Sequence, residues 1–156
     1  MAEHLARDPA FGEPETGWLL ARASHALATA VSAEVRREGL ALRGYVVLQL
    51  AVQRPLPQQA LASSLGLDKT TMVAAVDELE DAGLVERRPD PADRRVRLVT
   101  VTDAGRTALA RARSVVARTE DDLLADLGDD RATLRRLLLT ALHGRLGAVP
   151  PGGSCV

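Results

Sequence analysis

The residues with the clearest chemical potential are the arginines of the stretch RRPDPADRR, which runs from Arg87 to Arg95. Four arginines flank two prolines and two aspartates, although the whole chain has a formal net charge of only −1. Guanidinium groups form strong, often bidentate, hydrogen bonds with phosphate and carboxylate groups. This stretch is therefore either the solvated tip of a hairpin or a surface that binds anions.

The rest of the sequence offers little for catalysis or metal binding. The histidines His4, His25 and His143 are scattered, and there is no cluster of cysteine and histidine. There is also no glycine-rich phosphate loop and no nucleophile elbow. We therefore expect neither an enzyme nor a cofactor or metal site. The single cysteine, Cys155, cannot form a disulfide within the chain, which favours a cytoplasmic protein.

The composition favours a soluble, mainly helical protein. Hydrophobic residues make up 46% of the chain but aromatic residues only 2%, so Leu, Val and Ala must fill the core. A β-sandwich would need more aromatic and β-branched residues. No apolar run approaches the roughly 20 residues that span a bilayer, so we expect no membrane partner.

Apolar periodicity predicts the helices that position the arginines. The clearest stripe is Met72, Ala75, Val76 and Leu79, which lie at i, i+3, i+4 and i+7. Asp68 is a good N-cap for this helix, and Gly83 ends it. The predicted helices are about 15–38, 42–52, 57–65, 68–82, 103–127 and 129–146.

Two of these helices and the arginine-rich stretch together predict a winged helix. The turn in SSLGLDKTT joins two short helices, as in a helix-turn-helix. After Gly83 the apolar period changes to two in LVERR and VRLVTV, with the turn-forming PDPAD between them. A helix-turn-helix followed by a β-hairpin is a winged helix, here at about 42–101, and RRPDPADRR lies at the hairpin tip.

The helices on either side of this unit have apolar faces that a small winged helix cannot cover. Pairing the helices of about 15–38 and 103–146 with the same helices of a second chain would bury these faces, and closed two-fold dimers are the commonest solution. We expect a single domain over 15–147, a flexible arm at 1–14 and a disordered tail at 148–156.

The region from Gly39 to Leu109 resembles the MarR family of bacterial transcription regulators. The matching segments are GLALRGYVVLQL, LPQQALASSLGLDKTTMVAAVDELEDAGLVER and RPDPADRRVRLVTVTDAG. The resemblance implies a mainly α fold with a small β-hairpin wing, flanked by dimerisation helices. It also implies a homodimer that binds a pseudo-palindromic operator in double-stranded DNA. A small organic ligand, often an aromatic acid or a phenol, commonly weakens the DNA binding of such repressors.

The resemblance assigns the helix that starts after Asp68 to the major groove, where its first turns contact the DNA. Lys69, Thr70 and Thr71 can bind phosphates or base edges. The next positions depart from the family pattern, in which a polar residue and an arginine are common. Apolar contact with thymine methyl groups is one substitute, and simple clearance of the groove floor is the other. Val73 and Ala74 stand at these two positions, and Glu78 replaces another residue that is commonly basic.

The resemblance also gives the hairpin tip a role. The arginine that matches Arg95 enters the minor groove, and the aspartate that matches Asp93 holds it in place. Narrow minor grooves concentrate negative potential and attract arginine. Arg94 can share either role. The candidates for phosphate contacts are the strand arginines Arg87, Arg88 and Arg97.

An effector site is expected between the dimerisation helices and the winged helix, as the resemblance implies. Arg22 and His25 lie at i and i+3 and can clamp the carboxylate of an organic acid. Trp18 lies one turn earlier, and Tyr45 lies on the second helix. The alternative is that Arg22 makes a surface ion pair and His25 belongs to the dimer interface.

Two other functions remain open. The first is a DNA-binding regulator that needs no ligand. The second is a winged helix that binds protein, but such a domain needs no arginine at the wing tip, so the ADRR segment argues against it. Loss of DNA binding in an Arg95→Ala variant would distinguish a DNA-binding protein from a protein-binding winged helix.

Overall fold

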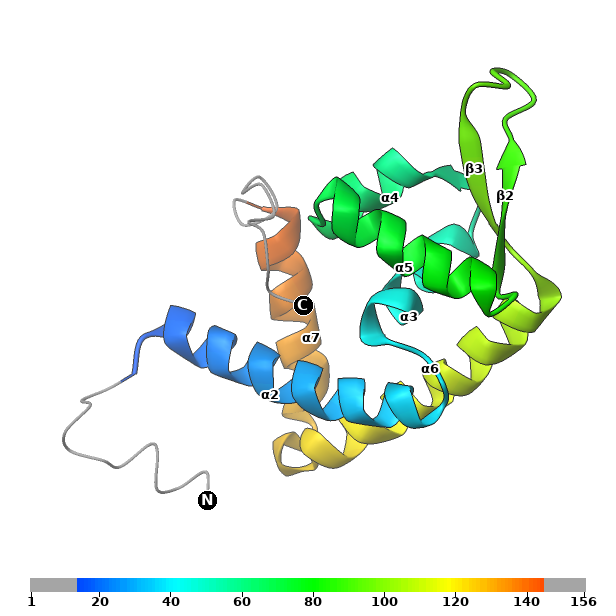
Figure 1. Cartoon of the computed structure of the whole chain (residues 1–156). Coiled ribbons are helices and arrows are strands. Elements are labelled where there is room, and N and C mark those ends of the chain that lie inside the picture. Colours follow the sequence, from blue (N-terminus) through cyan, green and yellow to red (C-terminus); the bar gives the residue numbers. More distant parts are fainter. Residues whose placement is uncertain (1–13, 145–156) are drawn as a thin grey trace.

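The computed structural model describes residues 14–144. The expected arm, apart from Pro14, and the expected tail lie outside the described residues, as do His4 and Cys155. The chain folds as a mainly helical protein with a small antiparallel sheet, which confirms the predicted fold class (Figure 1). The elements are α2 (Thr16–Arg37), α3 (Leu42–Ala51), β1 (Leu56–Pro57), α4 (Gln58–Leu65), α5 (Lys69–Asp81), β2 (Val85–Pro89), β3 (Arg97–Val101), α6 (Asp103–Leu123), the 3-10 helix η1 (Ala125–Leu127) and α7 (Asp130–His143).

Local sequence signals set most helix ends. Gly66 adopts φ 63° directly after α4, in the left-handed region that favours glycine, and this turns the chain sharply into α5. The Thr102 hydroxyl accepts a hydrogen bond of 3.0 Å from the backbone N–H of Gly105 and caps α6. The helix predicted over 103–127 is shorter in the structure, where α6 ends at Leu123 and η1 follows.

The wing sheet has three strands rather than the two of the predicted hairpin. Its order is β1-β3-β2, and Leu56 of β1 pairs with Val99 of β3. Strand β1 is not predicted, because it is only two residues long and its Pro57 is assigned to the start of the helix over 57–65. Proline is tolerated on an edge strand because no ladder hydrogen bond is required there. This strand ties the start of α4 to the base of the wing.

The winged helix has a continuous apolar core. Leu48 of α3, Leu61 of α4, Met72 of α5 and Leu109 of α6 are almost completely buried, and none of the described polar or charged residues is buried. Gly105 allows α6 to start against the wing, since a Cβ there would lie 2.0 Å from the Leu84 carbonyl oxygen. The core therefore fixes α5 and the wing relative to each other.

The flanking helices are covered unevenly. The second half of α2 packs on α6 and buries Val31 and Val35, whereas the first half extends away from the winged helix (Figure 1). Helix α7 has no buried residue. No described helix is long and apolar enough to cross a membrane. The large apolar side chains left exposed on these helices are Trp18, Leu19, Leu20, Leu123, Leu137, Leu138, Leu139 and Leu142, with Leu127 on η1.

Candidate nucleic-acid interface

The N-terminus of α5 is capped by an aspartate and a threonine acting together. The Asp68 carboxylate accepts hydrogen bonds from the Thr71 backbone N–H at 2.9 Å and from the Thr71 hydroxyl at 2.6 Å. The bond from the Thr71 hydroxyl, followed by that from its backbone N–H, lowers the pKa of Asp68. Thr71, predicted to contact DNA, therefore has its hydroxyl proton engaged within the helix.

The outward side of the first two turns of α5 is formed by a short mixed surface. Lys69 and Thr70 are exposed on the first turn, and Val73 and Ala74 are exposed on the second. The Val73 side chain is large and apolar, yet 37% of the residue is accessible to solvent. Of these four residues, only Lys69 and Thr70 carry a polar side chain.

The second half of α5 is acidic and connects to the wing. Arg87 of β2 forms ion pairs with both Asp77 and Glu80 of α5. The Glu80 carboxylate also accepts a hydrogen bond of 2.9 Å from the Arg87 backbone N–H. Glu78 and Asp81 are exposed on the same helix. Arg87 thus links the helix that precedes the turn to the strand that follows it.

This linkage changes the expected role of Arg87. Only 22% of its side chain is exposed. Burial by itself lowers the pKa of the guanidinium, but the hydrogen bonds from Arg87 to Asp77 and Glu80 outweigh burial and raise it. A guanidinium held by two carboxylates offers little charge to phosphate. Arg87 therefore joins the wing to α5, and its pairing with two carboxylates weighs against the phosphate contact that its sequence position suggested.

The tip of the wing is shaped by its aspartates. The Asp90 carboxylate accepts a hydrogen bond of 2.8 Å from the Ala92 backbone N–H, and the Asp90 N–H donates to the Val96 carbonyl at 2.9 Å. The Val96 N–H donates in turn to the Asp93 carbonyl. Short aspartate side chains commonly fold back on the backbone in this way. These bonds give the segment between β2 and β3 a defined shape.

Asp93 holds Arg95, as the sequence comparison led us to expect. The Asp93 carboxylate accepts hydrogen bonds from the Arg95 backbone N–H at 3.0 Å, from Nε at 3.1 Å and from Nη2 at 3.3 Å. The bonds from the guanidinium, followed by that from the backbone, lower the pKa of Asp93. The Arg95 side chain remains 92% exposed. It is an oriented cation at the outermost part of the wing.

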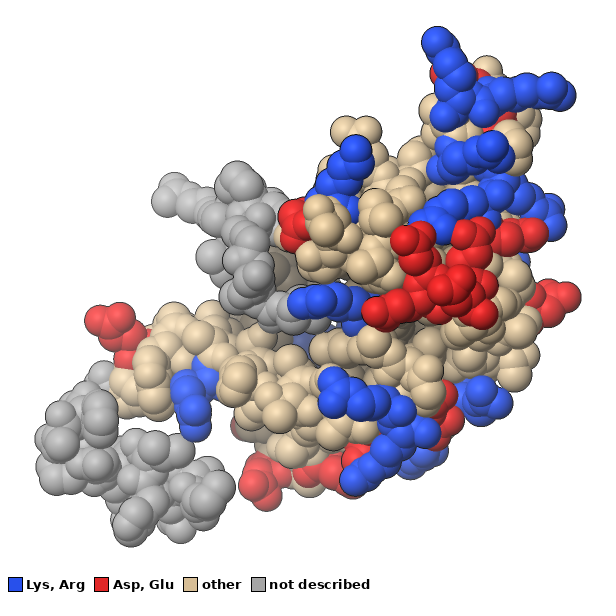
Figure 2. Space-filling view, in the orientation of Figure 1, with Lys and Arg blue, Asp and Glu red and all other residues tan. Residues whose placement is uncertain are grey.

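The other wing arginines are less constrained. Arg88 forms an ion pair with Glu86 on the same strand, while Arg94 and Arg97 are exposed and border a shallow pocket with Asp90. Figure 2 shows basic side chains gathered at the wing tip, at the upper right, and acidic side chains gathered below them over α5. The nearly neutral chain therefore separates its charges, and the wing tip is its most basic part in this view.

The comparisons with known proteins agree with this geometry. A sequence model of the MarR family matches residues 44–96. The repressor CouR, in a structure with a 23-mer DNA duplex, is 36% identical, with a TM-score of 0.74 over 81% of this chain and 92% of that one. The chain belongs to the MarR family. The family model covers most of the predicted winged helix, and the structural match extends well beyond it.

Other relatives of this MarR-family chain are described with a bound ligand or with the operon that they regulate. CouR from Rhodococcus jostii RHA1, with bound p-coumaroyl-CoA, is 33% identical, with a TM-score of 0.72 over 82% of this chain and 91% of that one. The Mycobacterium tuberculosis protein Rv2887, in complex with p-aminosalicylic acid, is 30% identical, with a TM-score of 0.70 over 84% and 100%. A candidate regulatory protein for the hcr operon of Thauera aromatica is 39% identical over 103 residues, or 65% of this chain and 62% of that protein. The chain thus spans less than two thirds of the length of that relative.

The residues expected at an effector site do not all lie together in this MarR-family chain. The Arg22 guanidinium lies over the Trp18 ring, 5.8 Å from its centroid, and both residues are exposed on the first half of α2. His25 is exposed on the same helix. Tyr45 is buried in the winged-helix core, and its hydroxyl accepts a hydrogen bond of 2.6 Å from Gln49. Gln49 in turn accepts from Arg113 at 2.9 Å, which joins α3 to α6.

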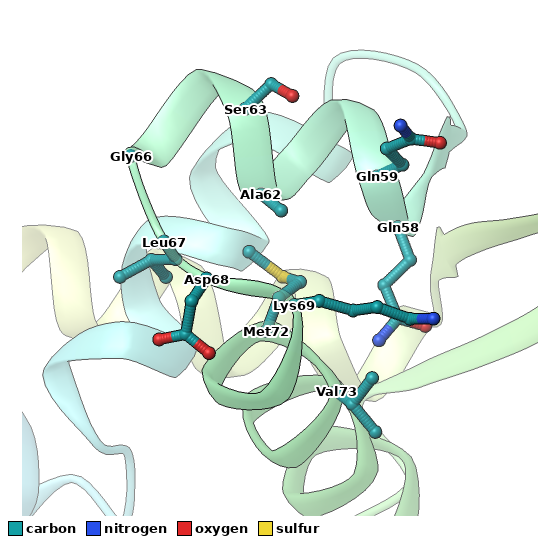
Figure 3. Close-up of a pocket in the computed structure, with 10 residues that line it drawn as sticks. All are labelled: Gln58, Gln59, Ala62, Ser63, Gly66, Leu67, Asp68, Lys69, Met72 and Val73. Atoms are coloured by element: carbon teal, nitrogen blue, oxygen red, sulfur yellow. The ribbon is translucent and has the colours of Figure 1, made fainter. Parts of the chain in front are cut away.

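A larger cavity, of about 730 Å³, lies between α4 and α5 (Figure 3). Neither Tyr45 nor any of the three α2 residues lines it. Within residues 14–144, no group of three or more acidic, histidine or cysteine side chains could hold a metal ion. The residues that line the cavity are Gln58, Gln59, Ala62, Ser63, Gly66, Leu67, Asp68, Lys69, Met72 and Val73.

Proposed function

We propose that this chain is a sequence-specific DNA-binding transcription repressor that acts as a homodimer and is released from its operator by a small organic ligand. The observation that carries the proposal is Arg95, an exposed guanidinium aimed by Asp93 at the tip of a wing. Such a group suits the narrow minor groove, where negative potential is concentrated. The shared core holds α5 and the wing in a fixed arrangement, and we assign the exposed start of α5 to the major groove.

The proposed DNA contacts fall into two groups. On α5 they are Lys69 and Thr70, with Thr71 acting mainly through the helix cap. On the wing, Arg95 enters the minor groove, and Arg94, Arg88 and Arg97 contact phosphates. CouR, which is similar to this chain over most of its length, is named as a repressor bound to a DNA duplex. That similarity supports a double-stranded operator, and the proposed two-fold dimer would make the operator pseudo-palindromic.

Dimerisation is supported by the uncovered helices. Within the described part of the chain no residue of α7 is buried, and Leu137, Leu138 and Leu142 are exposed. Burying a leucine side chain contributes roughly 1.5–3 kcal/mol. A second copy of the chain would supply the missing surface for α7 and for the first half of α2. We propose that residues 15–147 form this single dimerising domain, and that the protein acts on DNA in the cytoplasm.

The ligand is proposed to be an aromatic acid or its thioester. The stacked Trp18 and Arg22 offer an aromatic face and a cation, and His25 lies one turn further along the helix. Related proteins are named with p-coumaroyl-CoA and p-aminosalicylic acid bound. The Tyr45 ring is buried in the core, so the proposed site depends on the three α2 residues.

The proposed function is tested by selecting duplexes from a random library with the full chain and measuring binding by fluorescence anisotropy. We expect a pseudo-palindromic sequence and an affinity that falls steeply with salt, with a logarithmic slope of about −0.9 per phosphate contact. A flat salt response, or no enriched sequence, would remove the DNA-binding function. No catalytic function is proposed.

Ligand release is tested on the selected duplex with p-coumaroyl-CoA and p-aminosalicylate as probes. We expect at least one probe to weaken DNA binding of the wild-type chain but not of an Arg22→Ala variant. An Arg36→Ala variant is the matched control, because Arg36 is exposed near the other end of the same helix. Equal release of the Arg22→Ala variant would exclude the α2 site, and no release by either probe would favour a regulator without this class of ligand.

A further inference from the structure

The outward side of α5 has an unusual lack of hydrogen-bonding groups for an element that reads DNA. The Thr71 hydroxyl donates its hydrogen bond to Asp68, and Asp77 forms an ion pair with Arg87. Between these two positions, the exposed residues of the second turn are Val73 and Ala74, which have no polar side-chain atom. Base pairs facing this turn therefore cannot be distinguished by side-chain hydrogen bonds from it.

The acidic half of α5 restricts which part of the helix can approach DNA. Glu78 and Asp81 are exposed, and the carboxylates of Asp77 and Glu80 are fixed on the side of the helix that meets β2. Carboxylates repel the phosphate backbone at short range. Close approach is thus limited to the first two turns, and this places the second turn at the limit of the contact region.

Val73 is a large apolar side chain at a position that is open to solvent. It is one of the few exposed large hydrophobic side chains of the winged helix. Figure 3 shows it projecting from α5 toward the same side as the end of the Lys69 side chain. Because a valine in a helix is nearly fixed in one rotamer, its two methyl groups present a rigid apolar surface and lose little entropy on contact.

We infer that Val73 is a specificity-determining residue that recognises thymine through the C5-methyl group in the major groove. Of the four bases, only thymine presents a methyl group there, and apolar side chains contact it directly. Ala74 extends the same apolar surface. This inference rests on the proposed DNA-binding function and adds the base that the second turn of α5 selects.

The test uses the full chain and the duplex selected from the random library. Each thymine of one half-site is replaced in turn by deoxyuridine, which removes only the methyl group and keeps base pairing. For the wild-type chain we expect at least one position at which this replacement weakens binding about three- to fivefold, as burial of one methyl group predicts. Replacement of thymines that flank the half-sites serves as the DNA control.

A Val73→Ala variant identifies the residue responsible. This variant should fold about as stably as the wild type, because the better helix propensity of alanine offsets the loss of a partly exposed side chain. It should bind thymine and deoxyuridine duplexes equally at the sensitive position, and Val73→Thr, which keeps one methyl group, should show an intermediate ratio.

Three results are decisive. Equal deoxyuridine effects in the wild-type and Val73→Ala chains would overturn the inference, as would the absence of any deoxyuridine effect in a chain that binds its selected duplex. Failure to enrich any duplex would instead overturn the proposed function and the inference with it.

Discussion

The wing tip and α5 differ in how they use charge, although the same core supports both. At the wing tip the aspartates shape the turn and aim Arg95, and the arginine side chains remain exposed. On α5 the charge is mainly negative, since its second half is acidic and its carboxylates neutralise Arg87. The wing therefore presents the stronger attraction for DNA, and α5 presents shape and apolar contact.

This difference shows that the number of arginines in RRPDPADRR does not measure the number of DNA contacts. Arg87 and Arg95 stand at opposite ends of that stretch, and both are bound by carboxylates. The carboxylates around Arg87 belong to another helix and partly bury it, whereas Asp93 lies two residues from Arg95 and leaves it exposed. The position of the carboxylate in the chain decides whether the arginine joins two elements or stays exposed to DNA.

The largest loss of DNA affinity should come from breaking the proposed dimer, because each protomer presents one wing and one α5 helix. A Leu138→Glu and Leu142→Glu double variant places charges on the uncovered face of α7. We expect a monomer by sedimentation equilibrium and a loss of DNA affinity of at least about 100-fold, because linked half-sites gain from effective concentration. A Thr133→Glu variant on the same helix is the control. A double variant that remains a dimer would show that α7 does not form the interface.

Removing the aimed cation should give the next largest effect. We expect Arg95→Ala to weaken operator binding by about 10- to 100-fold, as for a specific arginine contact, without changing the urea midpoint, because the side chain is exposed. Arg94→Ala removes the same charge from the wing tip and should cost only about threefold. If the two variants lose equal affinity, the wing acts as a general basic patch and the comparison with α5 loses its basis.

The joint between the two regions should matter for stability. Arg87→Ala leaves Asp77 and Glu80 without their shared partner, and the partly buried position suggests a loss of about 1–2 kcal/mol in the free energy of unfolding. Arg88→Ala breaks only the exposed pair with Glu86 and should cost no more than about 0.5 kcal/mol. Urea denaturation measures both, and equal losses would show that Arg87 does not join the wing to α5.

The smallest effect should come from loosening the aim of Arg95. Asp93→Asn keeps the turn acceptor but removes the charge, and we expect DNA affinity to fall severalfold. The pairing with Arg95 lowers the pKa of Asp93. Its contribution to folding stability is therefore fully present above the ordinary carboxyl pKa of about 4, and it is lost as the pH falls through the lower pKa of the folded state. This pairing should therefore contribute no pH dependence to DNA affinity from about pH 5 to 8. An Asn variant that binds like the wild type would show that aiming is not needed.

Much of the fold could be predicted because its signals are local. The Asp68 cap, the left-handed Gly66 and the change of apolar period after Gly83 each act within a few residues. The contact between Asp93 and Arg95 is also local, so it could be expected from the family pattern before the structure was known. Strand β1 could not, because two residues with a proline form a strand only when β3 is there to pair with them.

The sequence by itself determined the order of the helices and the wing, and which residue types could meet DNA. Only the tertiary structure decided how each charge is used. Asp77 and Glu80 lie 10 and 7 residues before Arg87, and no periodicity links a helix to a strand across a turn. Tyr45, too, lies in the core, because α3 turns its ring inward. Burial and pairing depend on how elements pack, so they are fixed only when the chain has folded.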